Sequence, residues 1–186
     1  EINNFTIKVP ADPSSACFFV VQTLLAKKSS LIIKNVCINE TRTGFIKILK
    51  KMGGRIKILN KKKYFGEDVA DILVKSSNLK GIKVPKKWIV KSIDDLVVIW
   101  VACGFAKGQS YFKGISELRF KESNRIKTMS QSLKKMGIKT KATEDTLKIF
   151  GNPKPYVKKN IKIHSNLDHR IAMANFVAGQ TSGANI

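Results

Sequence analysis

Acidic residues are scarce in this sequence. Its 186 residues include 13 Asp and Glu against 35 Lys and Arg, which gives a formal net charge of +22 at pH 7. A surface with this excess attracts anions by its long-range field, whatever the fold. Phosphorylated metabolites, nucleic acid and anionic membranes are therefore the classes of partner to weigh. Lysines at solvent-facing positions, such as Lys47 and Lys50, can equally form nothing more than a solvated face.

Cysteines and long apolar runs are also few. Cys17, Cys37 and Cys103 lie far apart among apolar residues, and no C-x-x-C spacing supports a zinc or redox role. We expect all three to pack in the core, which suits a reducing, cytoplasmic location. No apolar run reaches the ~18–20 residues that span a bilayer, so we expect no membrane partner. Residues 1–10 alternate like a strand and lack the apolar stretch of a signal peptide.

An internal repeat is the strongest pattern in the chain. The sequence Leu49–Gly53 (LKKMG) returns as Leu133–Gly137. Each copy closes an amphipathic helix, and the glycine is expected to end that helix in a left-handed conformation. The apolar positions of the two helices are Phe45, Ile48, Leu49 and Met52, and then Ile126, Met129, Leu133 and Met136.

A second feature occurs three times. Asp12, Asp94 and Asp168 each open an apolar helix candidate, over Ser14–Ala26, Asp95–Ala106 and His169–Ala178 respectively. Aspartate favours this place because its carboxylate accepts the free amide hydrogens of the first turn. Capping alone could explain each aspartate, but three equivalent corners with polar residues suggest one shared rim.

Together these segments predict repeated βαβαββ units in one α/β domain. Unit one covers residues 5–80, unit two covers 81–155, and an incomplete unit three covers 156–186. The apolar first helices should be buried and the lysine-rich second helices exposed. The run Lys61–Lys63 is expected at a hairpin tip. The predicted strands are Phe5–Val9, Leu31–Val36, Arg55–Leu59, Ala70–Lys75, Ile82–Val84, Gln109–Lys113, Ile138–Lys141, Thr146–Phe150 and Ile161–His164.

The segment Lys121-Glu122-Ser123-Asn124-Arg125 is a candidate anion site. It follows the strand-like stretch 117–120 and leads into a helix. If it is helical, Lys121 and Arg125 are four residues apart and Glu122 and Arg125 three apart, so all share one face. Two cations around one acid at a helix start suit a phosphate or carboxylate. Surface ion pairs at this spacing are common, so the pattern alone also fits a plain surface.

A second polar group, Asp168-His169-Arg170, also stands at a helix start. An acid, an imidazole and a guanidinium there lie at the positive end of the helix dipole. Asp94 occupies the matching corner of unit two, where site residues gather in repeated α/β folds. A capping aspartate with two incidental polar neighbours is the alternative interpretation.

The ordered motifs resemble the C-terminal part of 5-enolpyruvylshikimate-3-phosphate (EPSP) synthases, closest to their class II branch. The resemblance covers essentially the whole chain and implies an inside-out α/β barrel domain built of βαβαββ units, with the third incomplete here. Asn124 departs from the family, which usually has Asp at that position. The motifs are residues 10–16, 39–44, 51–54, 92–95, 117–125 and 168–173, which read PADPSSA, NETRTG, KMGG, SIDD, ELRFKESNR and DHRIAM.

The resemblance implies transfer of the enolpyruvyl group of phosphoenolpyruvate to the 5-hydroxyl of shikimate 3-phosphate, without metal or organic cofactor. It implies that Asp94 takes the hydroxyl proton and that Glu122 protonates the methylene carbon. Lys121 would bind shikimate 3-phosphate, Arg125 and Arg170 would hold phosphoenolpyruvate, and His169 would support the site. The chain would be part of one domain that needs an N-terminal domain as partner, so by itself it should bind weakly and turn over little.

Two other functions remain open at this point. The related transferase that acts on UDP-N-acetylglucosamine shares the repeat fold, although the two motifs around Glu122 and His169 argue against it. A basic nucleic-acid-binding module would use Tyr64 and Phe65 beside the lysine run. No RNA- or DNA-binding motif is present, so we expect no nucleic-acid partner.

Overall fold

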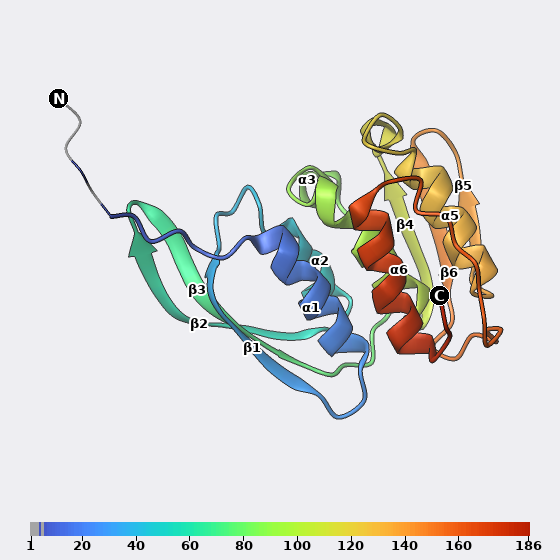
Figure 1. The fold of residues 1–186 in the computed structure, drawn as a ribbon, viewed down its shortest axis with the longest axis horizontal. Helices are drawn as coiled ribbons and strands as arrows, with labels where there is room; N and C mark the ends of the chain where they lie inside the picture. The colour runs from blue at the N-terminus through green and yellow to red at the C-terminus, as the bar shows by residue number, and fades with distance from the viewer. Residues whose placement is uncertain (1–3, 5) are drawn as a thin grey trace.

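Two three-stranded sheets lie on either side of a group of helices (Figure 1). The computed structural model describes residue 4 and residues 6–186. The strand orders are β1-β3-β2 and β4-β6-β5, and every neighbouring pair within these sheets is antiparallel. The elements are α1 Pro13–Leu25, β1 Ser30–Cys37, α2 Gly44–Lys51, β2 Arg55–Tyr64, β3 Glu67–Lys75, α3 Lys86–Val90, the 3-10 helix η1 Ile93–Asp95, α4 Leu96–Gly104, β4 Gly108–Lys113, the 3-10 helix η2 Ser116–Arg119, α5 Arg125–Lys135, β5 Lys139–Ala142, β6 Thr146–Gly151 and α6 His169–Ser182.

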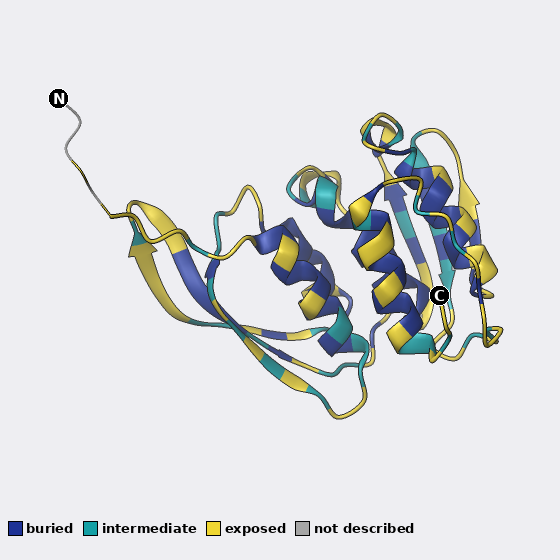
Figure 2. Ribbon diagram, viewed as in Figure 1, coloured by how far each residue is buried: buried dark blue, intermediate teal, exposed yellow. Residues whose placement is uncertain are grey.

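The apolar helices form the centre of the molecule. Helices α1, α4 and α6 contact one another, and all nine residues of α4 are buried. Burying so many aliphatic and aromatic side chains is the main driving force for this arrangement. Helices α1 and α6 keep one open side each, with Phe19 and Phe176 exposed (Figure 2). The prediction of buried first helices is thus confirmed fully for α4 and on most sides of the other two.

The amphipathic helices α2 and α5 lie outside this centre and pack on β2 and β5. Their predicted apolar positions are all buried, while the lysines at their ends are exposed. Gly53 and Gly137 follow the two helices with φ of 97° and 73°, in the left-handed region that glycine adopts without strain. The predicted pair of helix ends is therefore confirmed.

The strand β2 runs further than the sequence predicted. The run Lys61–Lys63 lies inside β2, and the turn falls at Phe65 and Gly66, so the hairpin-tip prediction is wrong. The reason is a polar contact that sequence patterning misses. Asp71 of β3 accepts hydrogen bonds from the Asn35 backbone N (2.9 Å) and the Asn60 side chain (2.8 Å). Register shifts occur at both asparagines, and pairing then resumes.

The predicted first strand of each unit is not a full strand. Residues 6–9, 82–84 and 161–164 lie outside the named strands, and Phe5 lies outside the described residues. Parallel pairing is reduced to isolated bridges, such as Ala11 with Val36 and Asn160 with Asn185. In unit two, Gly81 lies so close to the Gln109 backbone that a Cβ would collide with it. A glycine often marks such a close approach of two backbone segments.

Three smaller features of the structure differ from the sequence predictions. Residues Ser116–Arg119 form the 3-10 helix η2 rather than a strand, because Asp145 accepts hydrogen bonds from the backbone N atoms of Gly114 and Ser116 and fixes a turn. The short helix α3 was not predicted. Cys17 and Cys103 are buried as expected, but Cys37 at the end of β1 is only partly buried. In the part of the chain described, every helix is too short or too polar to cross a bilayer.

Candidate active site

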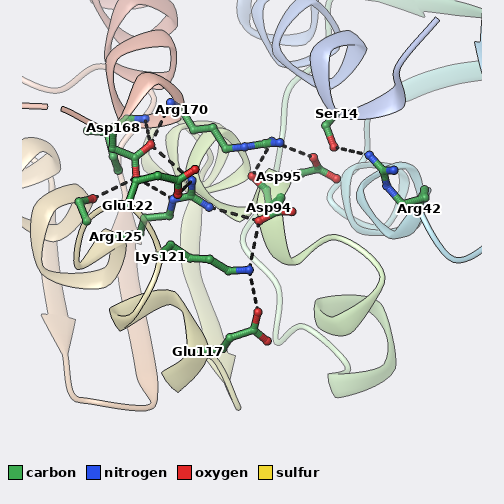
Figure 3. A network of polar contacts seen from close by, with 12 residues as sticks. Ser14, Arg42, Asp94, Asp95, Glu117, Lys121, Glu122, Arg125, Asp168 and Arg170 are labelled. Carbon is green, nitrogen blue, oxygen red and sulfur yellow. Dashed lines mark hydrogen bonds and ion pairs between the residues drawn. The ribbon is translucent and has the colours of Figure 1, made fainter. Parts of the chain in front are cut away.

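Four segments that are distant in the sequence meet at one corner of the molecule (Figure 3). They are the N-terminal ends of α1 and α6, the 3-10 helix η1, and the loop that leads into α5. Asp94, Lys121, Glu122, Arg125 and Arg170, which the sequence singled out, all belong to one network of ion pairs and hydrogen bonds here. The predicted shared rim therefore exists as a set of contacts.

Arg125 is the centre of this network. Its side chain is 1% exposed, and its guanidinium donates to three carboxylates. Nε lies 2.8 Å from Asp168 Oδ2, Nη1 lies 3.2 Å from Asp94 Oδ1, and Nη2 lies 2.6 Å from Glu122 Oε2. A buried guanidinium needs this degree of pairing, because an unpaired charge inside a protein is very costly. Arg125 thus ties three corners together.

Asp168 is the fully buried partner of Arg125. Its Oδ1 accepts from the backbone N of Arg170 at 3.0 Å and so caps α6, while Oδ2 also accepts from Ser123 Oγ at 3.0 Å. Burial by itself would raise the pKa of Asp168. The hydrogen bonds and charge of Arg125, with those of Ser123 and the helix backbone, outweigh burial and leave the pKa below its usual value. Asp168 therefore stays ionised and holds the start of α6 against α5.

The segment before α5 is not helical, which corrects the sequence prediction for Lys121 and Glu122. Helix α5 begins at Arg125, and Asn124 caps it by accepting from the Lys127 backbone N at 3.0 Å. Short polar residues favour this cap over a further helical turn. Lys121 instead reaches Glu117 at 2.7 Å and Asp94 Oδ1 at 3.7 Å.

The pKa of Lys121 is raised. The hydrogen bond with Glu117 is the main cause and the charge of Asp94 adds to it, while partial burial acts in the opposite direction. Lys121 is therefore a stable cation beside the Asp94 carboxylate.

Arg170 joins the same corner from α6. Its Nη1 donates to the backbone O of Asp94 at 3.1 Å and lies 3.9 Å from Asp95 Oδ1. Asp95 is 2% exposed, and sequence reasoning gave it no role of its own. Its place in the apolar run that starts α4 was the available signal, because an ionisable side chain at a core position is unusual.

The remaining predicted residue, His169, is the first residue of α6 and is exposed. Its side chain makes no hydrogen bond or ion pair with any residue that the structure describes. A further cation, Arg42, was not predicted for this site. Its Nη2 lies 3.1 Å from Asp12 Oδ1 and 3.3 Å from Ser14 Oγ, which ties the loop before α2 to the start of α1.

The corner has the elements of an acid–base site with anion-binding groups. The side chains of Asp94 and Glu122 are 43% and 49% exposed, so both carboxylates can meet a ligand, whereas Arg125 lies behind them. Every cation here already has an acidic partner. An anionic ligand must therefore replace a carboxylate or draw a cation towards itself.

The fold defines the class of protein, an enolpyruvyl-transferase-type domain. The solved structure of the enolpyruvyl transferase NikO from Streptomyces tendae superposes on 92% of the chain with a TM-score of 0.61 at 13% identity, which is evidence for the fold alone. The structure of EPSP synthase from Acinetobacter baumannii covers 96% of the chain with a TM-score of 0.90 at 40% identity.

The sequence comparisons identify the family. The profile described as EPSP synthase (3-phosphoshikimate 1-carboxyvinyltransferase) matches residues 1–186, and the chain belongs to this family. The 3-phosphoshikimate 1-carboxyvinyltransferase of Petrotoga mobilis is 46% identical over 92% of the chain, and that of Zymomonas mobilis is 43% identical over 100% of it. The chain spans 39% and 42% of the lengths of these two relatives.

Proposed function

We propose that this chain supplies one side of the active site of a 3-phosphoshikimate 1-carboxyvinyltransferase. That enzyme transfers the enolpyruvyl group of phosphoenolpyruvate to the 5-hydroxyl of shikimate 3-phosphate and releases phosphate. One observation carries the proposal: two accessible carboxylates, Asp94 and Glu122, bracket the buried Arg125 guanidinium at 3.2 and 2.6 Å. Two carboxylates held by one fixed positive charge support a reaction with two proton transfers.

The two carboxylates divide the proton transfers of the addition step. Asp94 takes the proton of the 5-hydroxyl as its oxygen bonds to C2 of phosphoenolpyruvate, and Glu122 gives a proton to the methylene carbon. Elimination reverses the second transfer: the methyl carbon returns a proton, phosphate leaves, and the enolpyruvyl double bond forms. Lys121, 3.7 Å from Asp94, contacts shikimate 3-phosphate beside this base.

The cations hold the two anionic substrates. Arg170 and Arg125 bind phosphoenolpyruvate, with His169 supporting it from the start of α6. Because Arg125 is buried behind Glu122, its contact with substrate requires Glu122 or Asp94 to move aside. Positive groups placed before reaction stabilise the developing charge without reorganisation at that moment.

The same proposal includes the repeat units, the cellular location, the cofactors and the partners. The repeat units remain 5–80, 81–155 and an incomplete 156–186, the location is cytoplasmic, and the reaction needs neither metal nor organic cofactor. We expect no nucleic-acid partner, so a mobility-shift test at ~150 mM salt should show only nonspecific retention. An N-terminal domain supplies the other half of the substrate contacts, so the chain alone should bind substrates weakly and turn over little.

A chimera tests the proposal directly. This chain replaces the matching segment of the Petrotoga mobilis relative, and phosphate release is measured with shikimate 3-phosphate and with UDP-N-acetylglucosamine as acceptors. We expect turnover with shikimate 3-phosphate only. Asp94→Asn and Glu122→Gln should each lower kcat by roughly 10²–10⁴-fold, the usual contribution of a general acid or base.

Matched controls come from exposed carboxylates elsewhere in the chain. Asp68→Asn and Glu144→Gln remove surface ion pairs with Lys63 and Arg119 and should leave kcat unchanged. An active chimera that tolerates both site substitutions would refute the assigned roles. Preference for UDP-N-acetylglucosamine would refute the substrate.

A further inference from the structure

Asp95 is a buried acid that the proposed reaction leaves unused. It is 2% exposed, and its Oδ1 has no hydrogen-bond partner among the described residues. The nearest cation is Arg170, whose Nη1 lies 3.9 Å away, beyond hydrogen-bonding distance. Figure 3 shows the two side chains approaching from η1 and α6 across the corner. An ionised carboxylate in this position is compensated first by the Ser14 side chain and then by the charge of Arg170.

The surroundings of Asp95 disfavour its charge. Burial is the main cause that raises its pKa to about 6, and the Asp94 charge adds to it, while Ser14, Arg170 and Arg42 act in the opposite direction. The buried Cys17 thiol of α1 also faces it and has a pKa raised well above the usual value, mainly by burial and further by Asp95, so Cys17 stays neutral. The facing groups are thus Ser14 and Cys17 from α1, Asp94 from η1, Arg170 from α6 and Arg42 from the loop before α2.

We propose that Asp95 is a proton-linked counter-charge for Arg170, which takes up a proton from solvent when Arg170 binds an anion. This inference rests on the proposed anion-binding role of Arg170. An anion at the corner draws the guanidinium away from Asp95 and places a second negative charge nearby. Both changes favour the protonated carboxyl. Asp95 is therefore a positioning residue that acts through Arg170 and does not itself touch the substrate.

The proposal predicts that anions bind more tightly at mildly acidic pH. Above the pKa of Asp95, binding must be accompanied by proton uptake, and below it the carboxyl is already neutral. If a bound anion raises the pKa of Asp95 by about one unit, the dissociation constant changes by about tenfold between low and high pH.

Sulfate is a suitable probe because it stays a dianion from roughly pH 5 to 8, so that any pH dependence of its binding reports protons taken up by the protein. Binding to the chain is followed by NMR shift titration at several pH values. For the unmodified chain we expect the dissociation constant to rise about tenfold from pH 5 to pH 8. Asp95→Asn should flatten this dependence, and Asp95→Glu should restore it.

Two variants test whether other groups carry the proton. Asp94→Asn removes the neighbouring carboxylate, and His169→Gln removes the side chain that precedes Arg170 at the start of α6. Both variants keep Asp95, so binding should still weaken as the pH rises, and in Asp94→Asn the midpoint should move to lower pH because the Asp94 charge raises the pKa of Asp95. A slope that survives in Asp95→Asn, or is lost in either control, overturns the assignment of the proton to Asp95.

A second measurement uses the unmodified chain, so it does not depend on whether a variant folds. The ¹³C resonance of the Asp95 carboxyl in the unmodified chain should titrate at a higher pH with saturating sulfate than without it. An unchanged midpoint refutes the inference while leaving the anion site intact. Sulfate binding that is absent, or unaffected by Arg170→Gln, refutes the proposed anion site and the inference with it.

Discussion

The two regions built on the first and second sheets share one architecture but differ in how their charged side chains are paired. Both build a three-stranded sheet with the last strand in the middle, and both end their amphipathic helix with a left-handed glycine. The first unit's corner pair, Arg42 with Asp12, has side chains that are 54% and 47% exposed. The second unit's Arg125 is 1% exposed and is paired with the fully buried Asp168 of the third unit.

The units also use their helix caps differently. Asp12 caps α1, whereas no side chain caps α2. In the second unit α4 has no side-chain cap, and Asn124 caps α5. Asp94 lies in a 3-10 turn and caps nothing, so its carboxylate is available to Lys121 and Arg125. The comparison teaches that two similar sheets can differ at their corners: an aspartate that caps no helix is left to pair with cations from other segments.

The largest expected effect contrasts the two corner ion pairs. Arg125→Ala leaves Asp168 buried without its cation and should lower the free energy of unfolding by about 3–5 kcal/mol. Arg42→Ala breaks an exposed pair and should cost under about 1 kcal/mol. Urea unfolding of both variants measures the difference. Equal losses would show that the two corners are energetically alike, contrary to their burial.

The next effect concerns Asp95, whose raised pKa makes its ionisation a cost to the folded state. Below about pH 4 it is protonated in both folded and unfolded chains, so Asp95→Asn should change nothing. Between about pH 4 and 6 only the unfolded chain loses the proton, and the cost grows. At pH 8, Asp95→Asn should therefore stabilise the chain, by at most about 3 kcal/mol for a pKa of about 6 against the usual 3.8.

Asp145 provides a control, because its substitution should change the stability in the opposite direction. Partial burial acts to raise its pKa, but hydrogen bonds from the backbone N–H groups of Gly114 and Ser116 outweigh it, and the pKa is lowered. Asp145→Asn should therefore destabilise the chain at pH 8 and have less effect as the pH falls below about 4. Thermal unfolding of both variants across this range gives the signs, and stabilisation by both would contradict the assignment.

A smaller effect compares the two helix-ending glycines. Gly53→Ala and Gly137→Ala both place a side chain at positive φ, which costs about 1 kcal/mol. The new Cβ at Gly53 would meet the Asn78 carbonyl oxygen at 3.6 Å, an ordinary contact, whereas at Gly137 it would meet the Tyr156 oxygen at 2.5 Å. We expect Gly137→Ala to cost about 1–2 kcal/mol more. Equal unfolding midpoints would show that the backbone at Tyr156 can shift away from the new Cβ at little cost.

The smallest expected effects are at the caps. Asp12→Ala and Asn124→Ala each remove a side-chain acceptor and should cost about 1 kcal/mol. Asn124→Asp keeps the acceptor and adds a negative charge at a helix N-terminus, so its effect should stay within about 0.5 kcal/mol. A large change in Asn124→Asp would mean that this residue acts on the ion-pair network beyond its cap.

Much of the fold could be predicted because its signals are local. Apolar periodicity placed the helices to within a few residues, and the glycines after Met52 and Met136 marked two helix ends. The sequence failed where distant backbone decides the outcome. The long β2 depends on Asp71 reaching Asn60 from β3, and the 3-10 helix η2 depends on Asp145 from another loop.

Most residues of the candidate site could be predicted from the sequence, but their arrangement could not. The motifs singled out Asp94, the Lys121–Arg125 segment and Arg170, and all of these meet in one network. The expected helix through Lys121 is absent, because Asn124 caps α5 three residues later. Asp95 was overlooked although it stands at the start of an apolar run, and its burial shows why its charge matters.

By itself the sequence determined the family, the repeat, the apolar helices and the residues that gather at their starts, because periodicity, capping and motif order are written along the chain. The tertiary structure decided which carboxylate is free, which is paired and which is buried. Ion pairing and desolvation depend on distances between segments that are remote in sequence, as between Arg125 and Asp168 or between Asp95 and Arg170.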